Sequence, residues 1–415
     1  MPTRRGPFQE QLVIVMVGLP ARGKTYIASK LGRYLRWLGY HTRVFNIGQY
    51  RREQLGAHQP ATFYDPGNAS AHEQRREMAQ AALDDMLDWF RVGGEIGIYD
   101  GTNSTQERRR RLSKACHDAG LKVLFLESIC ENDERIEANL RATKLDSDDY
   151  AGVDPATAAA DFHARIGFYR SAYEPISDGE VSYIKFIDVG RRIVVNRIEG
   201  YLAGKVVFFL SNTHLEPRRI WLTRHGESAF NPEQRVGGDP PLSERGARYA
   251  KALAPFLATR CGTNSQPVVM TSTLARTVET AGALDWPSMA WKLLDEIDAG
   301  ICDGLTYAQI EERMPNEFAA RQADKFNYRY PRGESYRDVI ARLEPVIIEI
   351  ERQRRPVVVV AHQAVLRALY AYLGDHPPAG CPHLLIPLHT VIELTPGPAG
   401  FSEQRFDLDT TMKSS

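Results

Sequence analysis

VIVMVGLPARGKTY, residues 13–26, is the most informative stretch of the first half of the chain. Its first five residues are apolar and predict a short buried strand, and Gly18, Gly23, Lys24 and Thr25 then fit the phosphate-binding pattern G-x-x-x-x-G-K-[ST]. Glycines let backbone N–H groups approach a phosphate chain, and the helix that follows points its positive end at the same phosphates. The stretch therefore predicts a nucleotide site in which Lys24 contacts the β- and γ-phosphates and the Thr25 hydroxyl holds Mg²⁺.

Composition excludes several other classes of protein. Lys plus Arg and Asp plus Glu both number 52, so no overall field favours nucleic acid or a membrane surface. No segment approaches the roughly 18 apolar residues that span a bilayer. The five cysteines are scattered and lack paired spacing, which predicts reduced thiols, a cytoplasmic location and no zinc site.

Strands alternate with helices through the rest of the first half. We expect strands at 42–47, 96–99, 122–126, 182–188 and 205–210. Arg51 and Arg52 follow the first of these, and Asp100 ends the second, where a phosphate-loop enzyme places an acidic residue beside Mg²⁺ or as a base. Ser104 and Glu107 predict a capping box for the next helix. The pattern predicts an α/β domain with a mostly parallel sheet, of the nucleoside-monophosphate-kinase type.

The run Arg108–Arg111 suggests a basic patch. Four consecutive helical residues point all around the axis, so solvent exposure explains most of the run, although one member can turn inward. Later on this half, Arg165 and Tyr169 share a helix face at i, i+4.

Three strand ends in the second half carry a different chemistry. The strands expected at 220–223, 268–271 and 357–361 are followed by Arg224-His225, by Arg276, and by His362 with Gln363 and Arg367. Parallel strands bring such ends to one edge of a sheet. Arginines can hold a phosphoryl group, one neutral imidazole can attack phosphorus, and the other can stabilise charge.

Glu296 is our choice of proton donor for this site, although its neighbours Asp295 and Asp298 leave the choice open. The polar joint at 211–219 precedes the first strand of the second half. We therefore expect two domains, residues 1–214 and 215–415.

Both halves together resemble the bifunctional 6-phosphofructo-2-kinase/fructose-2,6-bisphosphatase family. The matching phrases are GLPARGKTY, GQYRRE, TNST with ERR, LESIC, RHGES, EIDAG, YPRGESY, RLEPVI, AHQAV and PLHT. The resemblance implies a P-loop kinase domain followed by a histidine-phosphatase domain like that of phosphoglycerate mutases, which share the RHG core. It also implies small-molecule substrates and a possible homodimer.

For the kinase half, the resemblance implies ATP as phosphoryl donor, with Mg²⁺ at Thr25 and Asp100. The nucleotide would contact Gly18, Leu19, Pro20, Ala21, Arg22, Gly23, Lys24, Thr25, Tyr26, Asn139 and Lys144, and fructose 6-phosphate would contact Arg51, Arg52, Arg75, Thr102, Arg108, Arg165 and Tyr169. Asp100, Lys24 and Lys144 match catalytic positions, and Arg108 becomes the inward member of its run. Cys130 matches a kinase-site position, while its residue type alone predicts a small core residue. The family usually has Ala after the acidic residue, where this chain has Gly101.

For the phosphatase half, the resemblance implies that His225 becomes phosphorylated and that Glu296 donates the proton. Arg224, Asn231, Arg276 and His362 match contacts to the transferred phosphate. The rest of the bisphosphate would contact Gly237, Tyr307, Arg321, Lys325, Tyr336, Gln363 and Arg367. The stretch 321–336 favours fructose 2,6-bisphosphate over a mutase substrate.

Two alternative functions remain open from the sequence. One is a phosphate-loop kinase for another small substrate fused to a general histidine phosphatase or mutase. The other is a metabolite-binding regulator with inactive sites, which the presence of Lys24, Asp100, His225, Glu296 and His362 argues against.

Overall fold

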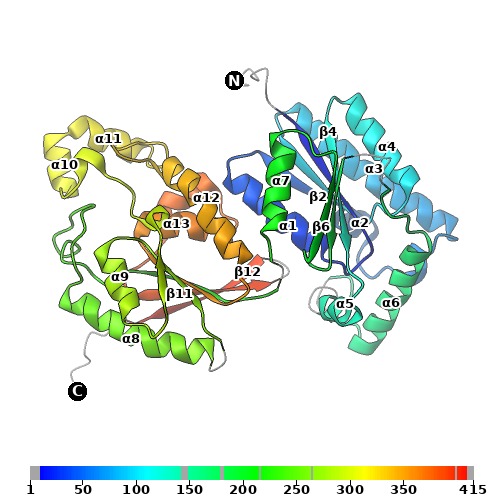
Figure 1. The fold of residues 1–415 in the computed structure, drawn as a ribbon. Helices are drawn as coiled ribbons and strands as arrows, with labels where there is room; N and C mark the ends of the chain where they lie inside the picture. The colour runs from blue at the N-terminus through cyan, green and yellow to red at the C-terminus, as the bar shows by residue number, and fades with distance from the viewer. Residues whose placement is uncertain are drawn as a thin grey trace. The chain divides into compact units, whose positions relative to one another are not determined.

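The computed structural model describes residues 10–141, 148–177, 182–214, 216–262, 265–397 and 400–408. The chain divides into two compact units, Met1–Thr213 and His214–Ser415. Each unit is built around its own six-stranded sheet (Figure 1). The α/β class predicted from the alternation of strands and helices is therefore confirmed in both units.

The first unit opens on the predicted strand and helix that flank the phosphate-loop pattern. Its elements are β1 (Leu12–Val17), α1 (Lys24–Trp37), β2 (Thr42–Asn46), α2 (Ile47–Leu55), η1 (Ala61–Tyr64), α3 (Ala69–Arg91), β3 (Ile96–Asp100), α4 (Gln106–Asp118), β4 (Lys122–Ile129), α5 (Asp133–Leu140), α6 (Pro155–Ser171), β5 (Tyr183–Ile187), β6 (Arg192–Asn196) and α7 (Tyr201–Ser211). The sheet order is β2-β3-β1-β4-β5-β6, and only the pairing of β5 with β6 is antiparallel.

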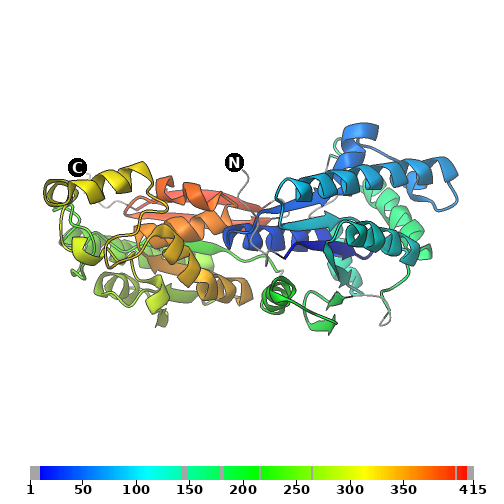
Figure 2. The ribbon, with the colours of Figure 1, turned by 90° about the horizontal axis from the view of Figure 1, so that it is seen from above.

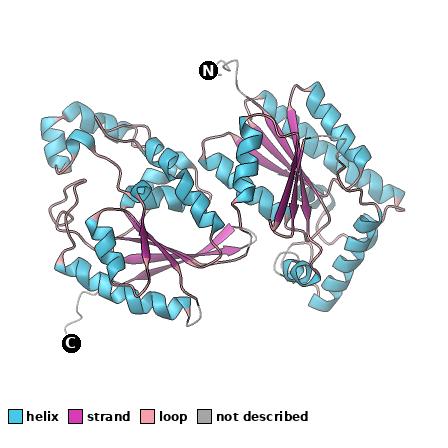
Figure 3. Ribbon diagram, viewed as in Figure 1, coloured by secondary structure: helices cyan, strands magenta, loops and turns pink. Residues whose placement is uncertain are grey.

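Both faces of this sheet are covered by helices, as Figure 3 shows. Every side chain of β1 is buried, which is why the strand is a continuous apolar run. Val13, Val15 and Val17 pack in one core with residues of α3 and α4. On α1, the Tyr34 ring stacks on Phe209 of α7 at 4.3 Å between centroids.

Two local predictions for this unit are wrong. Residues 205–210 lie in the helix α7, not in a strand. Val and Phe favour strands, but Leu202, Val206 and Leu210 are buried at helical spacing. The helix α4 is capped by Thr105, whose side chain accepts a hydrogen bond from the Arg108 nitrogen, so the capping box predicted at Ser104 is one residue early.

The second unit repeats the arrangement with different strand order. Its elements are β7 (Ile220–Arg224), α8 (Glu244–Cys261), β8 (Val268–Thr271), α9 (Ala275–Gly282), β9 (Ser288–Ala290), η3 (Lys292–Leu294), η4 (Gly300–Cys302), α10 (Tyr307–Arg313), α11 (Pro315–Ala323), α12 (Tyr336–Arg352), β10 (Val357–Ala361), α13 (Gln363–Leu373), η5 (Pro378–His383), β11 (Thr390–Gly397) and β12 (Gly400–Asp407). The sheet order is β12-β11-β7-β10-β8-β9. Strands β7, β10, β8 and β9 are parallel, while β11 and β12 are antiparallel to their neighbours.

Helices again cover both faces of the sheet. Trp221, Val269 and Val358 pack with Tyr249 and Leu253 of α8 in one core. In Figure 1, α12 and α13 lie on the side of the strands opposite to α8 and α9. The α10–α11 pair lies at the edge of the unit, away from the sheet, in both views (Figures 1 and 2). Within the described part of the chain, every helix is too short or too polar to cross a membrane.

A close backbone contact joins the end of β7 to the start of α8. A Cβ atom on Gly246 would lie 2.1 Å from the Glu227 carbonyl oxygen, and one on Gly226 would lie 2.4 Å from the Gly246 carbonyl oxygen. Neither oxygen belongs to a flexible side chain, so the two backbones can approach only because both residues lack a side chain. This contact fixes the loop that follows β7.

Gly246→Ala is expected to lower the free energy of unfolding of the second unit by about 1–3 kcal/mol, the usual cost of overpacking. The measurement is a urea unfolding curve. Gly282→Ala on α9 is the matched control, because nothing lies within 4 Å of its added Cβ and the helix should gain up to about 1 kcal/mol. Equal effects of the two variants would contradict the role given to this contact.

Candidate active sites

The phosphate loop of the first unit is held against the neighbouring strands. Gly18 has a φ of 130°, its nitrogen donates to the Thr102 carbonyl at 3.0 Å, and a Cβ there would lie 2.4 Å from the Ser128 carbonyl oxygen. Gly23 caps α1 in a left-handed conformation with φ 79°. At position 18, only glycine avoids a clash with the Ser128 carbonyl oxygen, and at position 23 glycine adopts the left-handed conformation without strain. Backbone geometry therefore explains both glycines of the pattern.

Side chains bind the carbonyl oxygens of this loop. Lys24 Nζ donates to the Leu19 carbonyl at 2.6 Å, and Ser128 Oγ donates to that of Arg22 at 2.5 Å. Asn139 Nδ2 of α5 donates to the Ala21 carbonyl at 3.1 Å. With its carbonyls engaged in this way, the loop and the N-terminus of α1 fit an anionic phosphate chain.

Asp100 ends β3 next to this loop and is 2% exposed. One carboxylate oxygen accepts a hydrogen bond from Asn46 Nδ2 at 2.6 Å, which orients the side chain. At Gly101, where the family usually has Ala, a Cβ would lie 2.4 Å from Cδ1 of Ile47, the end of a flexible side chain at the start of α2. A small rotation of the Ile47 side chain would make room for it.

Arginines of the first unit converge on a carboxylate that sequence reasoning missed. Asp149 lies 2.5 Å from Nη2 of Arg51, 3.7 Å from Nη1 of Arg165 and 3.8 Å from Nη1 of Arg52. Burial would raise the pKa of the Asp149 carboxyl, but these arginines outweigh burial and hold the pKa below its usual range. Nε and Nη1 of Arg51 and Nε of Arg165 are buried without a hydrogen-bond partner among the described residues. Buried N–H groups of this kind fit an anionic ligand that the structure does not contain.

Aromatic rings complete this cluster. The Arg165 guanidinium lies 3.8 Å from the centre of the Tyr64 ring, and Tyr64 lies 5.6 Å from Tyr169. Arg75 donates to the Phe63 carbonyl in the same wall. The structure therefore brings together four of the residues predicted to contact a sugar phosphate, namely Arg51, Arg75, Arg165 and Tyr169.

The inward residue of the arginine run is not the expected one. Arg109 is 2% exposed and donates to the Glu174 carbonyl at 2.8 Å, whereas Arg108 is only half-buried. Arg109 is one position further along α4, which turns it toward the core. Arg108 instead stands near the Tyr99 hydroxyl and Arg75, whose pKa is lowered by burial and in part by Arg108.

Cys130 is buried at 6% exposure in a core with Ile136 and Leu140 of α5, as its residue type alone predicts. Lys144 lies outside the described residues. Tyr26, in the first turn of α1, has its ring 5.4 Å from Lys30 Nζ.

In the second unit, the ring of His225 is held in one tautomer. Arg276 Nε lies 3.1 Å from His225 Nε2, and His225 Nδ1 lies 2.7 Å from the Gly226 carbonyl oxygen. Because a guanidinium can only donate and a carbonyl can only accept, Nε2 carries the lone pair and Nδ1 carries the hydrogen. Burial first, and then the Arg276 and Arg224 charges, lower the pKa of His225 well below its usual value, so the ring stays neutral.

His362 lies beside this ring, with centroids 5.1 Å apart. Its Nε2 pairs with Ser272 Oγ at 2.8 Å, and its Nδ1 is buried without a partner within the described ranges. Burial, followed by Arg276 and His225, lowers its pKa well below the usual value. Sequence reasoning missed Ser272, although its place directly after β8 was the available signal.

Among the three acidic candidates, Glu296 contacts α13, the helix that follows His362. Its Oε1 accepts from the Ala364 nitrogen at 3.2 Å in the first turn of α13, next to Gln363. Asp295 instead accepts from Thr273 Oγ1 at 2.8 Å, and Asp298 accepts from the Gly300 nitrogen at 2.8 Å. Burial lowers the pKa of Arg224 to about 10, although Glu296 acts in the opposite direction.

The loop after β7 is braced by two residues from the predicted set. Asn231 Oδ1 accepts from the Ser228 nitrogen at 2.8 Å. Gly237 has a φ of 69°, and a Cβ there would lie 1.6 Å from Oδ1 of Asp303. Gly238, which follows, receives a hydrogen bond from Arg276 Nη1 at 2.8 Å. Gly237 thus serves the backbone turn that brings this loop to Arg276.

The remaining predicted residues form hydrogen bonds with tyrosine hydroxyl groups or with a backbone carbonyl. Arg321 donates to the hydroxyl groups of Tyr307 and Tyr330 at 2.9 and 2.8 Å. Arg367 donates to the Tyr336 hydroxyl at 3.2 Å. Lys325 Nζ lies 3.3 Å from the Pro382 carbonyl, and its pKa falls to about 8 because of burial and then the charges of Arg367 and Arg321. Lys325 is therefore within electrostatic reach of both arginines.

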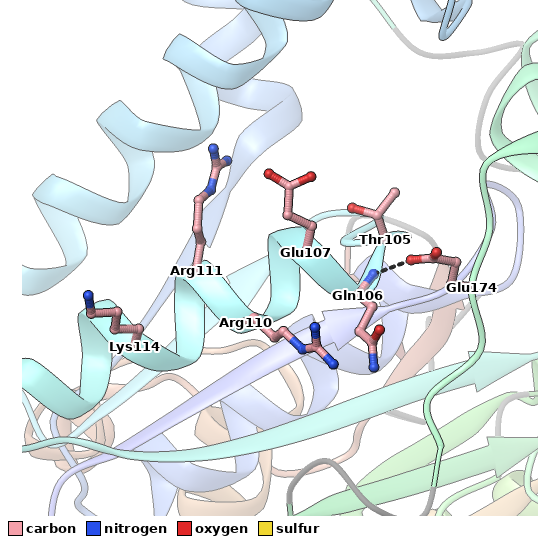
Figure 4. Close-up of a pocket in the computed structure, with 7 residues that line it drawn as sticks. All are labelled: Thr105, Gln106, Glu107, Arg110, Arg111, Lys114 and Glu174. Atoms are coloured by element: carbon pink, nitrogen blue, oxygen red, sulfur yellow. Dashed lines mark hydrogen bonds between the residues drawn. The ribbon is translucent and has the colours of Figure 1, made fainter.

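A surface hollow of about 490 Å³ lies along α4 and contains none of the predicted site residues. Figure 4 shows its lining residues, Thr105, Gln106, Glu107, Arg110, Arg111, Lys114 and Glu174. Two carboxylates nearly balance its three cations, and its side chains lie at the surface. It therefore lacks the buried, unpaired N–H groups that mark the Asp149 cluster.

Similarity to known proteins agrees with this geometry. Residues 4–217 match the model of the 6-phosphofructo-2-kinase family, and residues 220–409 match that of the histidine phosphatase superfamily (branch 1). A protein of Arabidopsis thaliana named 6-phosphofructo-2-kinase/fructose-2,6-bisphosphatase is 50% identical over 97% of this chain, and the chain spans 55% of its length. One of Gallus gallus with the same name is 48% identical over 92% of this chain and 82% of its own length.

The Homo sapiens protein named 6-phosphofructo-2-kinase/fructose-2,6-bisphosphatase 3 is 46% identical over 92% of this chain and 74% of its own length. Among solved structures, a mycobacterial glucosyl-3-phosphoglycerate phosphatase is 29% identical, covers 47% of this chain and all of its own, and has a TM-score of 0.39. On the family models and the curated relatives, the chain belongs to the 6-phosphofructo-2-kinase/fructose-2,6-bisphosphatase family.

Proposed function

We propose that this chain makes fructose 2,6-bisphosphate from ATP and fructose 6-phosphate and hydrolyses it back to fructose 6-phosphate and phosphate. Residues 1–214 act as the kinase domain and residues 215–415 as the phosphatase domain. The observation that carries the proposal is the neutral His225, with its Nε2 lone pair facing Arg276, in a chain that also holds an intact phosphate loop. The proposed cytoplasmic location and homodimer rest on cysteine usage and on family resemblance.

In the kinase domain, the phosphate loop and α1 bind the triphosphate of ATP. Gly18–Tyr26 surround the phosphates, Lys24 neutralises the transferring group, and Asn139 supports the loop from α5. Thr25 and Asp100 fit Mg²⁺, since Thr25 offers a hydroxyl in the first turn of α1 and Asp100 offers an oriented carboxylate at the end of β3, the strand beside β1. When bound, Mg²⁺ would neutralise charge on the phosphate oxygens. Lys144 is a second proposed cation for the phosphates.

The proposed binding site for fructose 6-phosphate is the Asp149 cluster. The unpartnered N–H groups of Arg51 and Arg165 suit a phosphate dianion, and Arg75, Arg52, Thr102, Arg108 and Tyr169 complete the proposed pocket. Asp100 either accepts the proton of the attacking sugar hydroxyl or holds Mg²⁺, and both roles use the same orientation. Cys130 packs beside the site as a small core residue.

In the phosphatase domain, His225 Nε2 attacks the 2-phosphate. A bond forms between Nε2 and phosphorus while the bond from phosphorus to the fructose oxygen breaks. Arg224, Asn231, Arg276 and His362 stabilise the phosphoryl oxygens, and Glu296 gives its proton to the departing oxygen. Water then attacks the phosphohistidine and returns a proton to Glu296, which frees phosphate. Gly237, Tyr307, Arg321, Lys325, Tyr336, Gln363 and Arg367 bind the rest of the substrate.

Lys24→Met is expected to lower fructose 2,6-bisphosphate synthesis by roughly a hundredfold or more, because a preorganised cation is lost from a phosphoryl-transfer site. The assay supplies ATP with fructose 6-phosphate and follows the bisphosphate and free phosphate together. Hydrolysis of added bisphosphate is the internal control and should not change. Near-normal synthesis by the variant would overturn the kinase assignment.

Bisphosphate labelled at the 2-phosphate is expected to leave acid-labile, alkali-stable label on the wild-type protein and none on His225→Ala. A chelator should stop the kinase reaction and spare hydrolysis, because the proposed covalent route uses an imidazole nucleophile. Kinase activity of His225→Ala should persist and make the bisphosphate accumulate. Label that survives in the variant would show the mechanism to be wrong.

The phosphatase kcat/KM is expected to fall as the pH rises through about 8, where Lys325 of the enzyme without substrate loses its proton. The sign follows because the protonated amine attracts the phosphate and the neutral amine does not. Lys325→Arg keeps its charge in this range and should remove this alkaline limb. If kcat/KM of Lys325→Arg falls at the same pH as in the wild type, the fall reports the titration of another group.

A further inference from the structure

Arg342 of α12 donates hydrogen bonds to the backbone of residues 293–296, the segment that carries Glu296. Its Nη2 donates to the carbonyl oxygens of Asp295 at 2.7 Å and Glu296 at 3.3 Å, and its Nη1 donates to that of Leu293. Three carbonyls along one short stretch thus depend on one guanidinium. Its planar fork allows this, which an ammonium group could not reproduce.

Glu334 forms hydrogen bonds both with Arg342 and with the backbone that follows Glu296. Its Oε1 accepts from Arg342 Nε at 2.7 Å and its Oε2 from Nη2 at 3.1 Å, so the pair is bidentate. The same Oε2 accepts from the Asp298 nitrogen at 3.0 Å, and the Glu334 nitrogen donates to the Asp298 carbonyl at 2.9 Å. The backbone is therefore held both before and after Glu296.

The hydrogen bonds of Arg342 and Glu334 hold the backbone next to the carboxyl group of Glu296. Oε1 accepts from the Ile297 nitrogen at 2.9 Å and from the Ala364 nitrogen at 3.2 Å. Two backbone donors on Oε1 leave Oε2 as the oxygen that can carry a proton. The Ile297 nitrogen belongs to the backbone that Arg342 and Glu334 hold, and the Ala364 nitrogen belongs to α13. A shift of that backbone relative to α13 would therefore change the orientation of the carboxyl group.

Arg342 does not act as a phosphate ligand in this arrangement. Each of its three nitrogens already donates to a protein oxygen, unlike those of Arg51, which has two buried nitrogens without a partner in the described residues. Its contacts lie with the segment 293–296 and with Glu334. The Arg342 charge also contributes to the lowered pKa of His362, and a lysine would keep that charge, whereas these hydrogen bonds act on the chemistry through Glu296.

We propose that Arg342, together with Glu334, is a positioning residue for the proton donor of the phosphatase reaction. The proposal rests on the proposed role of Glu296 and adds to it a named device that keeps the carboxyl aligned. Such support matters because a displacement of about 1 Å in a reacting group can cost roughly a hundredfold in rate.

The first test is Arg342→Lys, which keeps the charge and most of the stem but loses the fork. The bisphosphatase kcat should fall by roughly ten- to a hundredfold, while KM for fructose 2,6-bisphosphate stays within about threefold. Arg329→Lys is the matched control, because Arg329 pairs with Asp338 at the start of the same helix and is 61% exposed in its side chain. That control should leave both constants unchanged.

The second test is a double-mutant cycle with Glu296→Gln. If Arg342 acts through the proton of Glu296, Arg342→Lys should lower kcat by less than about twofold once that proton is gone. An equal loss of kcat in both backgrounds, or a raised KM with unchanged kcat, would overturn the proposal. An unchanged rate for Glu296→Gln alone would instead refute the proposed role of Glu296, so the two failures can be told apart.

Unfolding curves of each variant separate positioning from loss of structure. If Arg342→Lys unfolds at assay temperature, Glu334→Gln replaces it, because the amide keeps the size of the side chain and removes the charged partner of Arg342. It should show the same fall in kcat with an unchanged KM. A folded Glu334→Gln with wild-type kcat would overturn the proposal.

Discussion

Parallel pairing of the central strands determines where the proposed site residues can lie. In the first unit, β1 pairs with β3 and β4, and Val15 opposite Tyr99 and Val17 opposite Glu127 set the register. In the second, Ala361 of β10 lies opposite Arg224 of β7. Parallel strands end at the same edge, so the phosphate loop and Asp100 meet at one edge, and His225 and His362 meet at the other unit's edge. A shift of one residue in either register would turn every side chain of the shifted strand to the opposite face.

The two units solve the same electrostatic problem in different ways. Buried cations of like charge repel, and removing each from water costs several kcal/mol unless it is compensated. The first unit compensates Arg51 and Arg165 with the Asp149 carboxylate. The second keeps both imidazoles neutral, since burial and Arg276 lower their pKa values. Only the second solution leaves a nitrogen lone pair next to an arginine, as nucleophilic attack on phosphorus requires.

Patterns local in sequence predicted most of this molecule. The phosphate loop, the strand ends and the two histidines were readable because each is a short stretch with a fixed backbone role. Predictions failed where long-range packing decides. The apolar run 205–210 is a helix because of the surface it covers, and Arg109 turns inward in place of Arg108 because of the start of α4. Asp149, Ser272 and Arg342 gave little local signal, since their partners are distant along the chain. The contact of Glu296 with α13 likewise depends on packing between segments distant in the sequence.

The fixed tautomer of His225 has a consequence for the identity of the covalent intermediate. Histidine can carry a phosphoryl group on either ring nitrogen, and the two products are distinct isomers with different hydrolytic stability. Here Nδ1 donates to the carbonyl of the next residue, Gly226, while Nε2 faces Arg276. In the proposed mechanism, phosphorylation would therefore occur on Nε2, the nitrogen remote from the main chain. One backbone carbonyl group, that of Gly226, would then select which phosphohistidine isomer forms.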